Sequence, residues 1–312
     1  MKKLKIFSAV LLLSLSLAQV SAAAANEQEE ISLFLNGSYL ACEVVPIIEQ
    51  GEILVPLRSL GEAMDMGIYW DEQTKTASIK SSGWRGEREL KFQSDSNTAA
   101  INGEKITLAV PVQIVNGRTM VPASAIAEGL DLAVTWDEKT QSLSLQERYR
   151  SQNGAAEIVL TPIKPDKDSS YMIYHGMQAE INGEKYEYAW EWNVGIGQYI
   201  VYNPPEIFWA DLNADGREEI IIRLVDGINT GTGVSWEKVY VLKPNGAEIA
   251  VQDAREYALS LAEKKEGYSV GEWASYEVTD GELTAGITVF ENGEQKAWRL
   301  RYIYTGDKLE IE

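Results

Sequence analysis

The residue types and spacing best suited to chemistry occur in one short acidic stretch, DLNADGREE, at positions 211–219. Oxygen-bearing side chains occupy its first, third, fifth and ninth positions, and a glycine at the sixth permits a sharp turn that folds them inward. These residues are Asp211, Asn213, Asp215 and Glu219. The main-chain carbonyl of Arg217 at the seventh position offers a further oxygen. Such a set suits calcium, a hard cation that takes about six to eight oxygen ligands.

Three interpretations of this stretch are open. The first is a calcium loop, but not an EF-hand, because the twelfth position is Ile222 within EEIIIRLV, the pattern of a buried strand. The second is an acidic Asx-type turn without metal, since Asp, Asn and Gly are ordinary turn residues. The third is a catalytic carboxylate pair, which would have to face a bond across a cleft rather than share one tight loop. Repulsion among three clustered acids favours the calcium loop.

The strand, loop and strand around these residues resemble the calcium loops of FG-GAP and VCBS-type repeats. The resemblance implies the ligands Asp211, Asn213, Asp215, the Arg217 carbonyl and Glu219. Those families repeat the unit around a β-propeller, whereas this sequence contains it once. We therefore expect a single structural calcium loop within a different sheet.

A second candidate site is the aromatic stretch KYEYAWEWNV. Alternation places Tyr186, Tyr188, Trp190 and Trp192 on one face of a predicted strand. Aromatic side chains favour strands and dominate cores, so a core face is one interpretation. The other is an exposed platform on which sugar rings stack, which would make the chain a carbohydrate-binding protein.

Residues that would support an enzyme are scarce. The single cysteine, Cys42, shares its strand face with Leu40 and Val44 and is expected to be a buried apolar thiol. The single histidine, His175, is expected in a turn or core and leaves little room for a histidine cluster. The sequence also lacks a serine-hydrolase elbow and a metalloprotease helix. We expect a non-enzymatic protein, with a hydrolase as the weakest alternative.

An internal repeat organises the first half of the chain. Asn36-Gly37, Val55-Pro56 and Trp70-Asp71-Glu72 recur 66 positions later at Asn102-Gly103, Val121-Pro122 and Trp136-Asp137-Glu138. Each copy predicts hairpin strands joined at Asn-Gly, a short helix that begins after the proline, and two further strands.

These duplicated landmarks resemble the copper amine oxidase N-terminal domain, also called the stalk domain. The resemblance covers residues 31–146 and implies a small unit in which an antiparallel sheet wraps a helix. It does not imply copper, because the metal chemistry of that family resides in another domain and the histidine cluster that copper would need is missing here. Copy two replaces the family's VPLR, kept at residues 55–58, by VPAS.

The N-terminus and the charge indicate where the protein works. Residues 1–22 have a basic start, an apolar run too short to cross a bilayer, and small residues at positions 20–22, the pattern of a secretory signal peptide. We expect a secreted or cell-surface protein without a transmembrane anchor after cleavage. Its net charge of −19 disfavours nucleic acid. Expected partners are extracellular or cell-wall glycan or another surface protein.

The remaining chain completes the predicted organisation. Residues 23–30 are expected to be flexible, residues 147–156 form a polar linker, and residues 157–312 form a strand-rich domain that carries the calcium-type loop. Apolar residues at helical spacing predict one helix over 251–265 in this domain. The expected fold class is α+β: duplicated antiparallel-sheet-plus-helix modules followed by a β-rich α+β domain.

Overall fold

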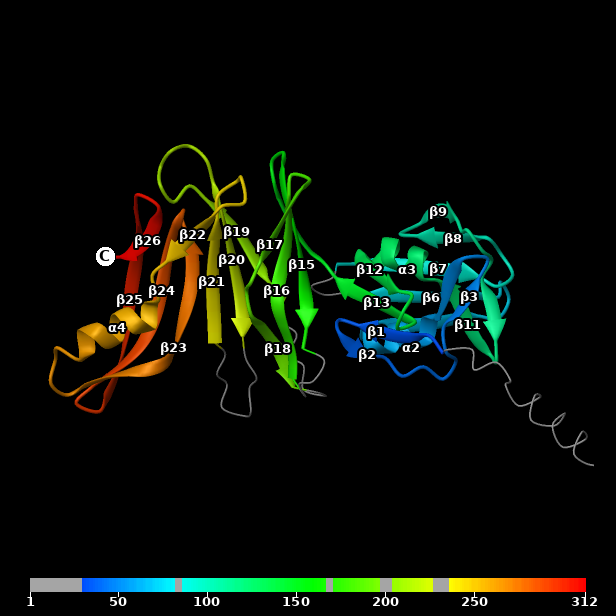
Figure 1. Ribbon diagram of the computed structural model, residues 1–312, viewed down its shortest axis with the longest axis horizontal. Coiled ribbons are helices and arrows are strands. Elements are labelled where there is room, and N and C mark those ends of the chain that lie inside the picture. The colour runs from blue at the N-terminus through cyan, green and yellow to red at the C-terminus, as the bar shows by residue number, and fades with distance from the viewer. Residues whose placement is uncertain (1–29, 82–85, 167–170, 197–203, 227–235) are drawn as a thin grey trace, which may run out of the picture.

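The computed structural model describes residues 30–81, 86–166, 171–196, 204–226 and 236–312. The expected signal peptide and most of the segment at 23–30 lie outside these residues. The chain forms two lobes side by side, one built from β1 to β13 and the other from β14 to β26 (Figure 1). Within the described ranges, helices long and apolar enough to cross a membrane are absent.

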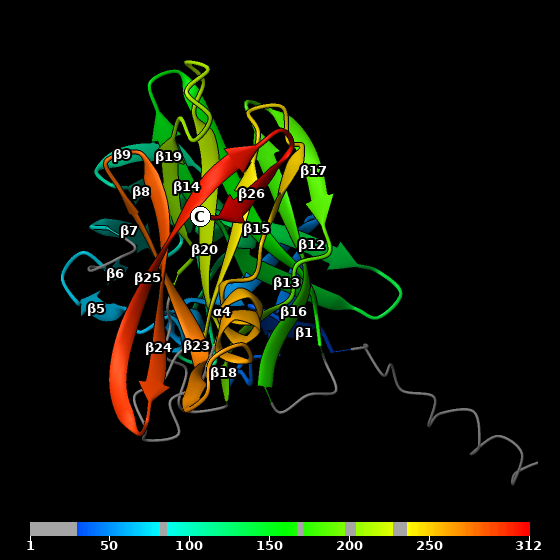
Figure 2. The same cartoon turned by 90° about the vertical axis from the view of Figure 1, so that its left-hand side faces the viewer.

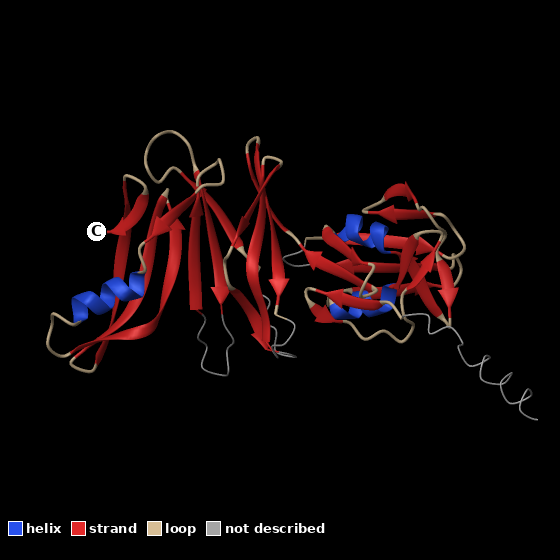
Figure 3. Ribbon diagram, in the orientation of Figure 1, coloured by secondary structure: helices blue, strands red, loops and turns tan. Residues whose placement is uncertain are grey.

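The expected α+β class is wrong, because the protein is a β-rich fold. Strands account for 59% and helices for 10% of the structure, and the described residues contain three helices (Figure 3). These helices have only 7, 8 and 9 residues. The sequence pattern located helices correctly but gave them too much weight beside the long strands that surround them.

The N-terminal lobe contains three sheets and two helices. The strand orders are β12-β13-β1-β2, β10-β11-β4-β3 and β5-β6-β7-β8-β9. The elements are β1 (Ser32–Leu35), β2 (Ser38–Tyr39), β3 (Ile47–Glu49), β4 (Glu52–Pro56), α2 (Leu57–Ala63), β5 (Gly67–Asp71), β6 (Thr76–Ser81), β7 (Arg88–Gln93), β8 (Thr98–Ile101), β9 (Glu104–Thr107), β10 (Gln113–Val115), β11 (Arg118–Pro122), α3 (Ala123–Leu130), β12 (Leu132–Asp137) and β13 (Ser142–Glu147).

Residues 66 positions apart occupy matching places in this lobe. Strands β4 and β11 pair antiparallel, and Val55 lies directly opposite Val121, its counterpart in the sequence. Helices α2 and α3 begin immediately after Pro56 and Pro122, as expected from proline's tolerance at helix starts. Each helix packs against the strand of the other half: α2 contacts β11 and α3 contacts β4.

The first and last strands of the lobe close it. Strand β1 pairs parallel with β13, with Leu33 opposite Leu143 and Leu35 opposite Leu145. All four leucines are buried in one core cluster that also contains residues of both helices. The lobe therefore has a single main core rather than one core for each copy.

The C-terminal lobe contains two sheets and one helix. One sheet has the order β14-β15-β16-β17 with β18 paired to β16, and the other has the order β19-β20-β21-β22-β26-β25-β24-β23. The elements are β14 (Tyr149–Asn153), β15 (Ala156–Pro165), β16 (Tyr171–Ile181), β17 (Glu184–Tyr188), β18 (Trp192–Ile196), β19 (Glu206–Ala210), β20 (Glu219–Asp226), β21 (Trp236–Leu242), β22 (Glu248–Val251), α4 (Ala254–Ala262), β23 (Tyr268–Thr279), β24 (Glu282–Glu291), β25 (Glu294–Thr305) and β26 (Lys308–Ile311).

Strand β20 lies between two cores. Ile220 and Ile222 pack into a cluster with β14 to β18, whereas Ile221 packs into a second cluster with α4 and β23 to β26. Figure 2, which looks along the molecule from its C-terminal end, shows α4 and β23 to β25 in front of β20. Burial on both faces explains why consecutive isoleucines suit this strand. This burial on both faces also determines where β20 starts, and the acidic loop ends at that point.

The expected linker is not a loop. Residues 147–156 contain the last residue of β13, all of β14, a turn and the first residue of β15. Strand β14 pairs with β15 over its whole length, from Tyr149 opposite Leu160 to Asn153 opposite Ala156. A single residue, Arg148, therefore separates the last strand of one lobe from the first strand of the other.

Candidate functional site

The acidic loop lies between β19 and β20, and its side chains turn inward as expected. The Asp211 carboxylate accepts hydrogen bonds from the main-chain N–H groups of Asp215 (3.0 Å) and Gly216 (2.8 Å). The Asp215 carboxylate accepts from the Arg217 N–H at 2.9 Å. Ala214 and Gly216 have φ of 58° and 84°, the left-handed conformation that tightens the loop. These contacts are those of an Asx-type turn.

Glu219 is the buried acid of this loop, with 2% of its surface exposed. Its carboxylate accepts from the Leu212 N–H at 2.8 Å and from the Asn213 side-chain amide at 3.1 Å. Burial raises the pKa of Glu219, and the charges of Asp215 and Asp211 add to this effect although the hydrogen bond from Leu212 opposes it. Asp211, Asp215 and Glu219, three of the expected ligands, therefore lie close enough for the first two charges to act on the third.

The loop carries the donor types that calcium prefers, but its present arrangement is that of a hydrogen-bonded turn. Among the residues that the structure describes, no three His, Cys, Asp or Glu side chains are placed to hold a metal ion. The Asn213 amide nitrogen lies where it bonds both Asp215 (3.2 Å) and Glu219 (3.1 Å). A cation bound by Asp215 and Glu219 would replace this amide as their shared positive partner. The donor chemistry therefore fits calcium after a rearrangement of Asn213.

The aromatic stretch does not form one exposed strand face. Tyr186 and Tyr188 lie in β17, whereas Trp192 begins β18 after a break. Trp190 and Trp192 are 4% and 1% exposed. The rings of Tyr188 and Trp190 stack at 4.4 Å, and Trp190 stacks on Tyr240 at 4.2 Å. These ring faces contact one another inside the lobe, so they offer no platform for a sugar as they lie.

The structure also places the two remaining candidate residues, Cys42 and His175. Cys42 is half-buried beside the N-terminal core, its thiol contacts the Leu40 carbonyl at 3.5 Å, and burial raises its pKa. His175 is neither in a turn nor in the core: it lies within β16 with 51% of its side chain exposed, 3.7 Å from the Asp166 carboxylate.

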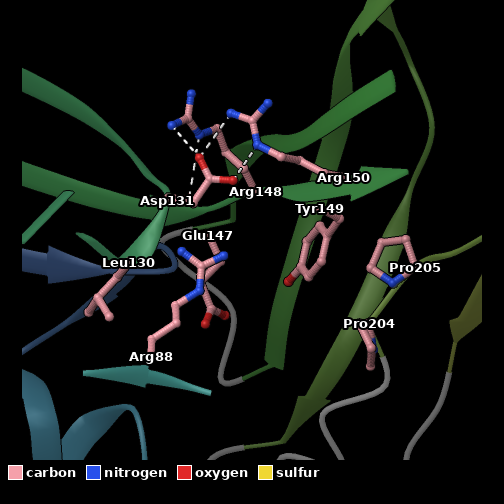
Figure 4. Close-up of a pocket in the computed structure, with 9 residues that line it drawn as sticks. All are labelled: Arg88, Leu130, Asp131, Glu147, Arg148, Tyr149, Arg150, Pro204 and Pro205. Atoms are coloured by element: carbon pink, nitrogen blue, oxygen red, sulfur yellow. Dashed lines mark hydrogen bonds and ion pairs between the residues drawn. The ribbon is translucent and has the colours of Figure 1, made fainter. Parts of the chain in front are cut away.

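A further site, at the junction of the lobes, was missed by the sequence analysis. A pocket of about 270 Å³ lies there. Its lining comprises Arg88, Leu130, Asp131, Glu147, Arg148, Tyr149, Arg150, Pro204 and Pro205 (Figure 4). The signal was the motif ERYR at 147–150, where two arginines alternate as they would on one face of a strand. Its polar character suggested a linker instead.

Asp131 is the centre of the charged side of this pocket. It follows α3 in the left-handed conformation, with φ of 56°, and its carboxylate faces Arg148 and Arg150 (Figure 4). The distances to its Oδ1 are 2.5 Å from Arg148 Nη2 and 3.0 Å from Arg150 Nη2. Burial opposes ionisation of Asp131, but Arg150, Arg148 and Arg88 outweigh it and lower the pKa.

Hydrogen bonds between the lobes lie beside the pocket. The Tyr174 hydroxyl in β16 donates to the main-chain carbonyl of Asn36 at 2.7 Å. The Asn36 side-chain amide in turn donates to the buried Glu147 carboxylate at 3.0 Å and accepts from the Glu147 N–H at 2.9 Å. This chain of contacts fixes the lobes to each other at the level of Arg148.

Comparison with known proteins agrees with the organisation of the N-terminal lobe. A search of curated proteins gave no match. The expected stalk-type resemblance is confirmed for the lobe that contains β1 to β13, and the part matched is the non-catalytic domain of its family. Residues 34–145 match the family model described as the copper amine oxidase N-terminal domain.

Proposed function

We propose that this chain is a secreted, non-enzymatic scaffold or binding protein of the cell surface, whose C-terminal lobe is stabilised by one structural calcium ion. The match of the N-terminal lobe to a non-catalytic domain supports the non-enzymatic part. The net charge of −19 supports a partner other than nucleic acid, such as an extracellular glycan or a surface protein.

One observation carries the calcium proposal: Glu219 is buried beside the charges of Asp211 and Asp215. A buried carboxylate next to like charges is unfavourable unless a cation compensates it. The oxygens of Asp211, Asn213, Asp215, Glu219 and the Arg217 carbonyl would hold the ion. Calcium would neutralise the acids and join the end of β19 to the start of β20.

Thermal unfolding of the full chain in EGTA and in millimolar calcium tests this proposal. Loops of this kind in extracellular modules bind with Kd of about 10⁻⁴ to 10⁻³ M, so millimolar calcium should add about 0.4 to 1.4 kcal/mol to the free energy of unfolding. The melting temperature should rise by roughly 1 to 5 °C. Magnesium should give a smaller rise, because it requires stricter geometry and dehydrates reluctantly.

The matched variants are Asp215→Asn and Glu263→Gln. The first removes a carboxylate from the loop and should abolish the calcium effect. The second removes the same charge from an exposed position after α4 and should leave the effect intact. An equal melting temperature in EGTA and calcium for the wild type would refute the calcium site.

A further inference from the structure

The five-stranded sheet of the N-terminal lobe has an outer face that does not pack on the core. Figure 2 shows strands β5 to β9 of this sheet in order along one side of the lobe. Ile79 and Leu90 lie opposite each other in β6 and β7, and both are fully buried in the main core. Lys80 and Glu89, the next pair, therefore face away from the core, and Gly67 of β5 lies opposite Lys80.

An open pocket lies on this outer face. Its volume of about 760 Å³ is within the usual range for small-molecule sites. The part of its lining that could contact a ligand comes from four neighbouring strands and turns: Gly67, Tyr69, Lys80, Glu87, Glu89 and Asn102. The pocket shares no residue with the acidic loop at 211–219.

Tyr69 supplies an exposed aromatic ring to this pocket, since 56% of its surface is open to solvent. The ring lies back along β5, because a Cβ atom at Gly67 would be 2.9 Å from the Tyr69 hydroxyl oxygen and 3.0 Å from its Cε2. Lys80 Nζ lies over the ring, 5.5 Å from its centroid. Gly67 thus leaves room for the ring and Lys80 holds it in place, while more than half of the residue's surface stays open to a ligand.

The second copy of the repeat lacks this arrangement. The residues 66 positions after Gly67, Tyr69 and Lys80 are alanine, threonine and glutamine. The tryptophan that follows Tyr69, in contrast, recurs at the same offset, as Trp70 and Trp136. The repeated fold therefore does not require an exposed tyrosine over a glycine, which supports a separate role for this one.

The charges around the pocket balance one another. Two basic and two acidic side chains line it. Glu89 pairs with Lys80 and with Lys91, each at 2.8 Å. Arg88 donates to the Gly129 carbonyl at 3.2 Å, at the end of α3, and is assigned no contact with a ligand. This balance selects neither for an anion nor for a cation, so the pocket is better suited to an uncharged molecule.

Polar groups beside the ring offer both donors and acceptors. The Lys80 ammonium has three N–H donors, and the Glu87 carboxylate is an acceptor in an exposed position. The Asn102 side chain is positioned by the Glu89 N–H, which donates to its Oδ1 at 2.9 Å, and its NH₂ group is a further donor. Hydroxyl groups both donate and accept, so they suit such a lining. A sugar ring combines hydroxyl groups at its edge with an apolar C–H face that can stack on an aromatic ring.

We propose that this pocket binds a neutral pyranose unit of an extracellular glycan, with the C–H face of the sugar on the Tyr69 ring and its hydroxyl groups bonded to Lys80, Glu87 and Asn102. This inference rests on the glycan partner included in the proposed function, and it names the place and the kind of sugar. The site lies in the N-terminal lobe, away from the aromatic stretch at 186–192, whose tryptophans are buried.

Calorimetric titration of the full chain with tetrasaccharides tests this inference. The probes are cellotetraose and N-acetylated chitotetraose, which are neutral, and tetragalacturonate, which is acidic. EGTA is present throughout so that calcium takes no part. Tighter binding of a neutral probe than of the acidic one supports the pocket, and the tighter neutral probe identifies the sugar.

Two results of this titration would overturn the inference: no binding of either neutral probe, or binding of the acidic probe at least as tight as theirs. Neither result removes the whole proposed function. A surface protein would remain as its partner, and the effect of calcium on the melting temperature is measured separately.

Tyrosine variants locate the binding. Tyr69→Ala should weaken binding of the neutral probe by about fivefold to tenfold because the stacking surface is lost, whereas Tyr69→Phe keeps the ring and should bind within about twofold of the wild type. Tyr39→Ala removes a tyrosine that is 64% exposed in β2 of the same lobe, and it should bind like the wild type. Equal affinity of Tyr69→Ala and the wild type would overturn this site, while glycan binding elsewhere on the chain would remain.

Gly67→Ala tests the position of the ring without removing a group that contacts the sugar. Its methyl group would meet the end of the Tyr69 side chain, which can move aside, so the melting temperature should stay within a few degrees of the wild type. Binding should fall several-fold because the ring is displaced. Gly286→Ala in β24 adds the same methyl group in the other lobe and should bind like the wild type. Unchanged binding in Gly67→Ala would overturn the proposed stacking on Tyr69.

Discussion

At the scale of single residues, burial decides what the predicted site residues do. Glu219 and Trp190 were both assigned to sites from their sequence pattern, and both are almost fully buried. For Glu219, burial strengthens the case for a bound cation, because an enclosed charge requires compensation. For Trp190, burial removes the ring from the surface on which it would contact a sugar. Alternation in the sequence specifies a shared face but not whether that face meets solvent.

The raised pKa of Glu219 predicts a pH dependence in the absence of calcium. Because the folded-state pKa lies above the unfolded value of about 4.5, the folded protein binds this proton more tightly. The stabilising contribution is complete below the unfolded pKa and is lost as pH rises through the folded pKa. Glu219→Gln should remove this contribution, so the wild type in EGTA should gain stability relative to the variant as pH falls from neutral toward that value.

Urea denaturation at several pH values in EGTA measures this difference. Glu263→Gln is the control, and its stability should follow the wild type in parallel across the range. If the stability of Glu219→Gln changed with pH in parallel with that of the wild type, protonation of Glu219 would not be the source of the pH dependence. In saturating calcium the dependence should reverse its sign, because protonation of Glu219 then competes with the metal.

Tyr174 carries a second prediction at this scale. Its hydroxyl is enclosed at the junction, and Tyr174→Phe would leave the Asn36 carbonyl without this donor. We expect a loss of about 1 to 2 kcal/mol in the free energy of unfolding. Tyr304→Phe is the control, since Tyr304 is a partly buried tyrosine of β25 that packs against a C-terminal core away from the junction. Equal urea midpoints for Tyr174→Phe and the wild type would show that the junction bond contributes nothing.

At the scale of elements, the sequence predicted helix starts and turns correctly where neighbouring residues alone determine the conformation. Pro56 and Pro122 mark the starts of α2 and α3, and both residues of the turns at 36–37 and 102–103 have positive φ, as Asn-Gly hairpins require. The helix expected at 251–265 is shorter and begins after Asp253, whose side chain caps it by accepting from the Glu256 N–H at 2.7 Å.

The segment at 147–156 shows where a prediction from neighbouring residues alone fails. Its polar residues suggested a linker, but the main chain is paired with β15, and its arginines face Asp131 at the end of α3. Such partners lie outside any local window of the sequence. The junction pocket could not be inferred for the same reason, because its lining comes from four separate segments.

Close packing of α3 on β7 yields a prediction at the element scale. A Cβ atom at Gly129 would lie 2.5 Å from Leu90 Cδ2 and 2.8 Å from its Cγ, and Leu90 is fully buried. Helix propensity alone would make Gly129→Ala stabilising by about 1 kcal/mol. Overpacking costs about 1 to 3 kcal/mol, so we expect a net loss of stability of about 1 kcal/mol.

Urea denaturation of Gly129→Ala and Gly286→Ala tests this packing. At Gly286 the added methyl group would meet only the Ser275 hydroxyl, which can rotate away. This control should change stability less than Gly129→Ala. If Gly129→Ala were more stable than the wild type, α3 and β7 would be less closely packed than the distances around Gly129 indicate.

At the scale of the whole molecule, polar contacts join the two lobes, while the apolar cores lie within the lobes, one main core in the N-terminal lobe and two in the C-terminal lobe. The N-terminal core and the two C-terminal cores contain different residues. The junction instead relies on hydrogen bonds such as Tyr174 to Asn36 and on the ion pairs of Asp131. Polar contacts between lobes weaken with salt more than buried apolar contacts do, so the junction should respond to ionic conditions before the cores do.

The large negative charge predicts a salt dependence of the complete chain. At neutral pH a net charge of −19 favours expansion through self-repulsion. Raising sodium chloride from about 0.02 M to about 0.5 M shortens the screening length, so the melting temperature in EGTA should rise by a few degrees. Near pH 4.6, the isoelectric point, the same salt step should have a much smaller effect because the net charge is close to zero.

Calcium should still add its own increment at the higher salt at neutral pH, since a buried site is screened less than surface charge. A melting temperature that falls with salt at neutral pH would indicate that attractive ion pairs, such as those around Asp131, outweigh repulsion in the whole molecule.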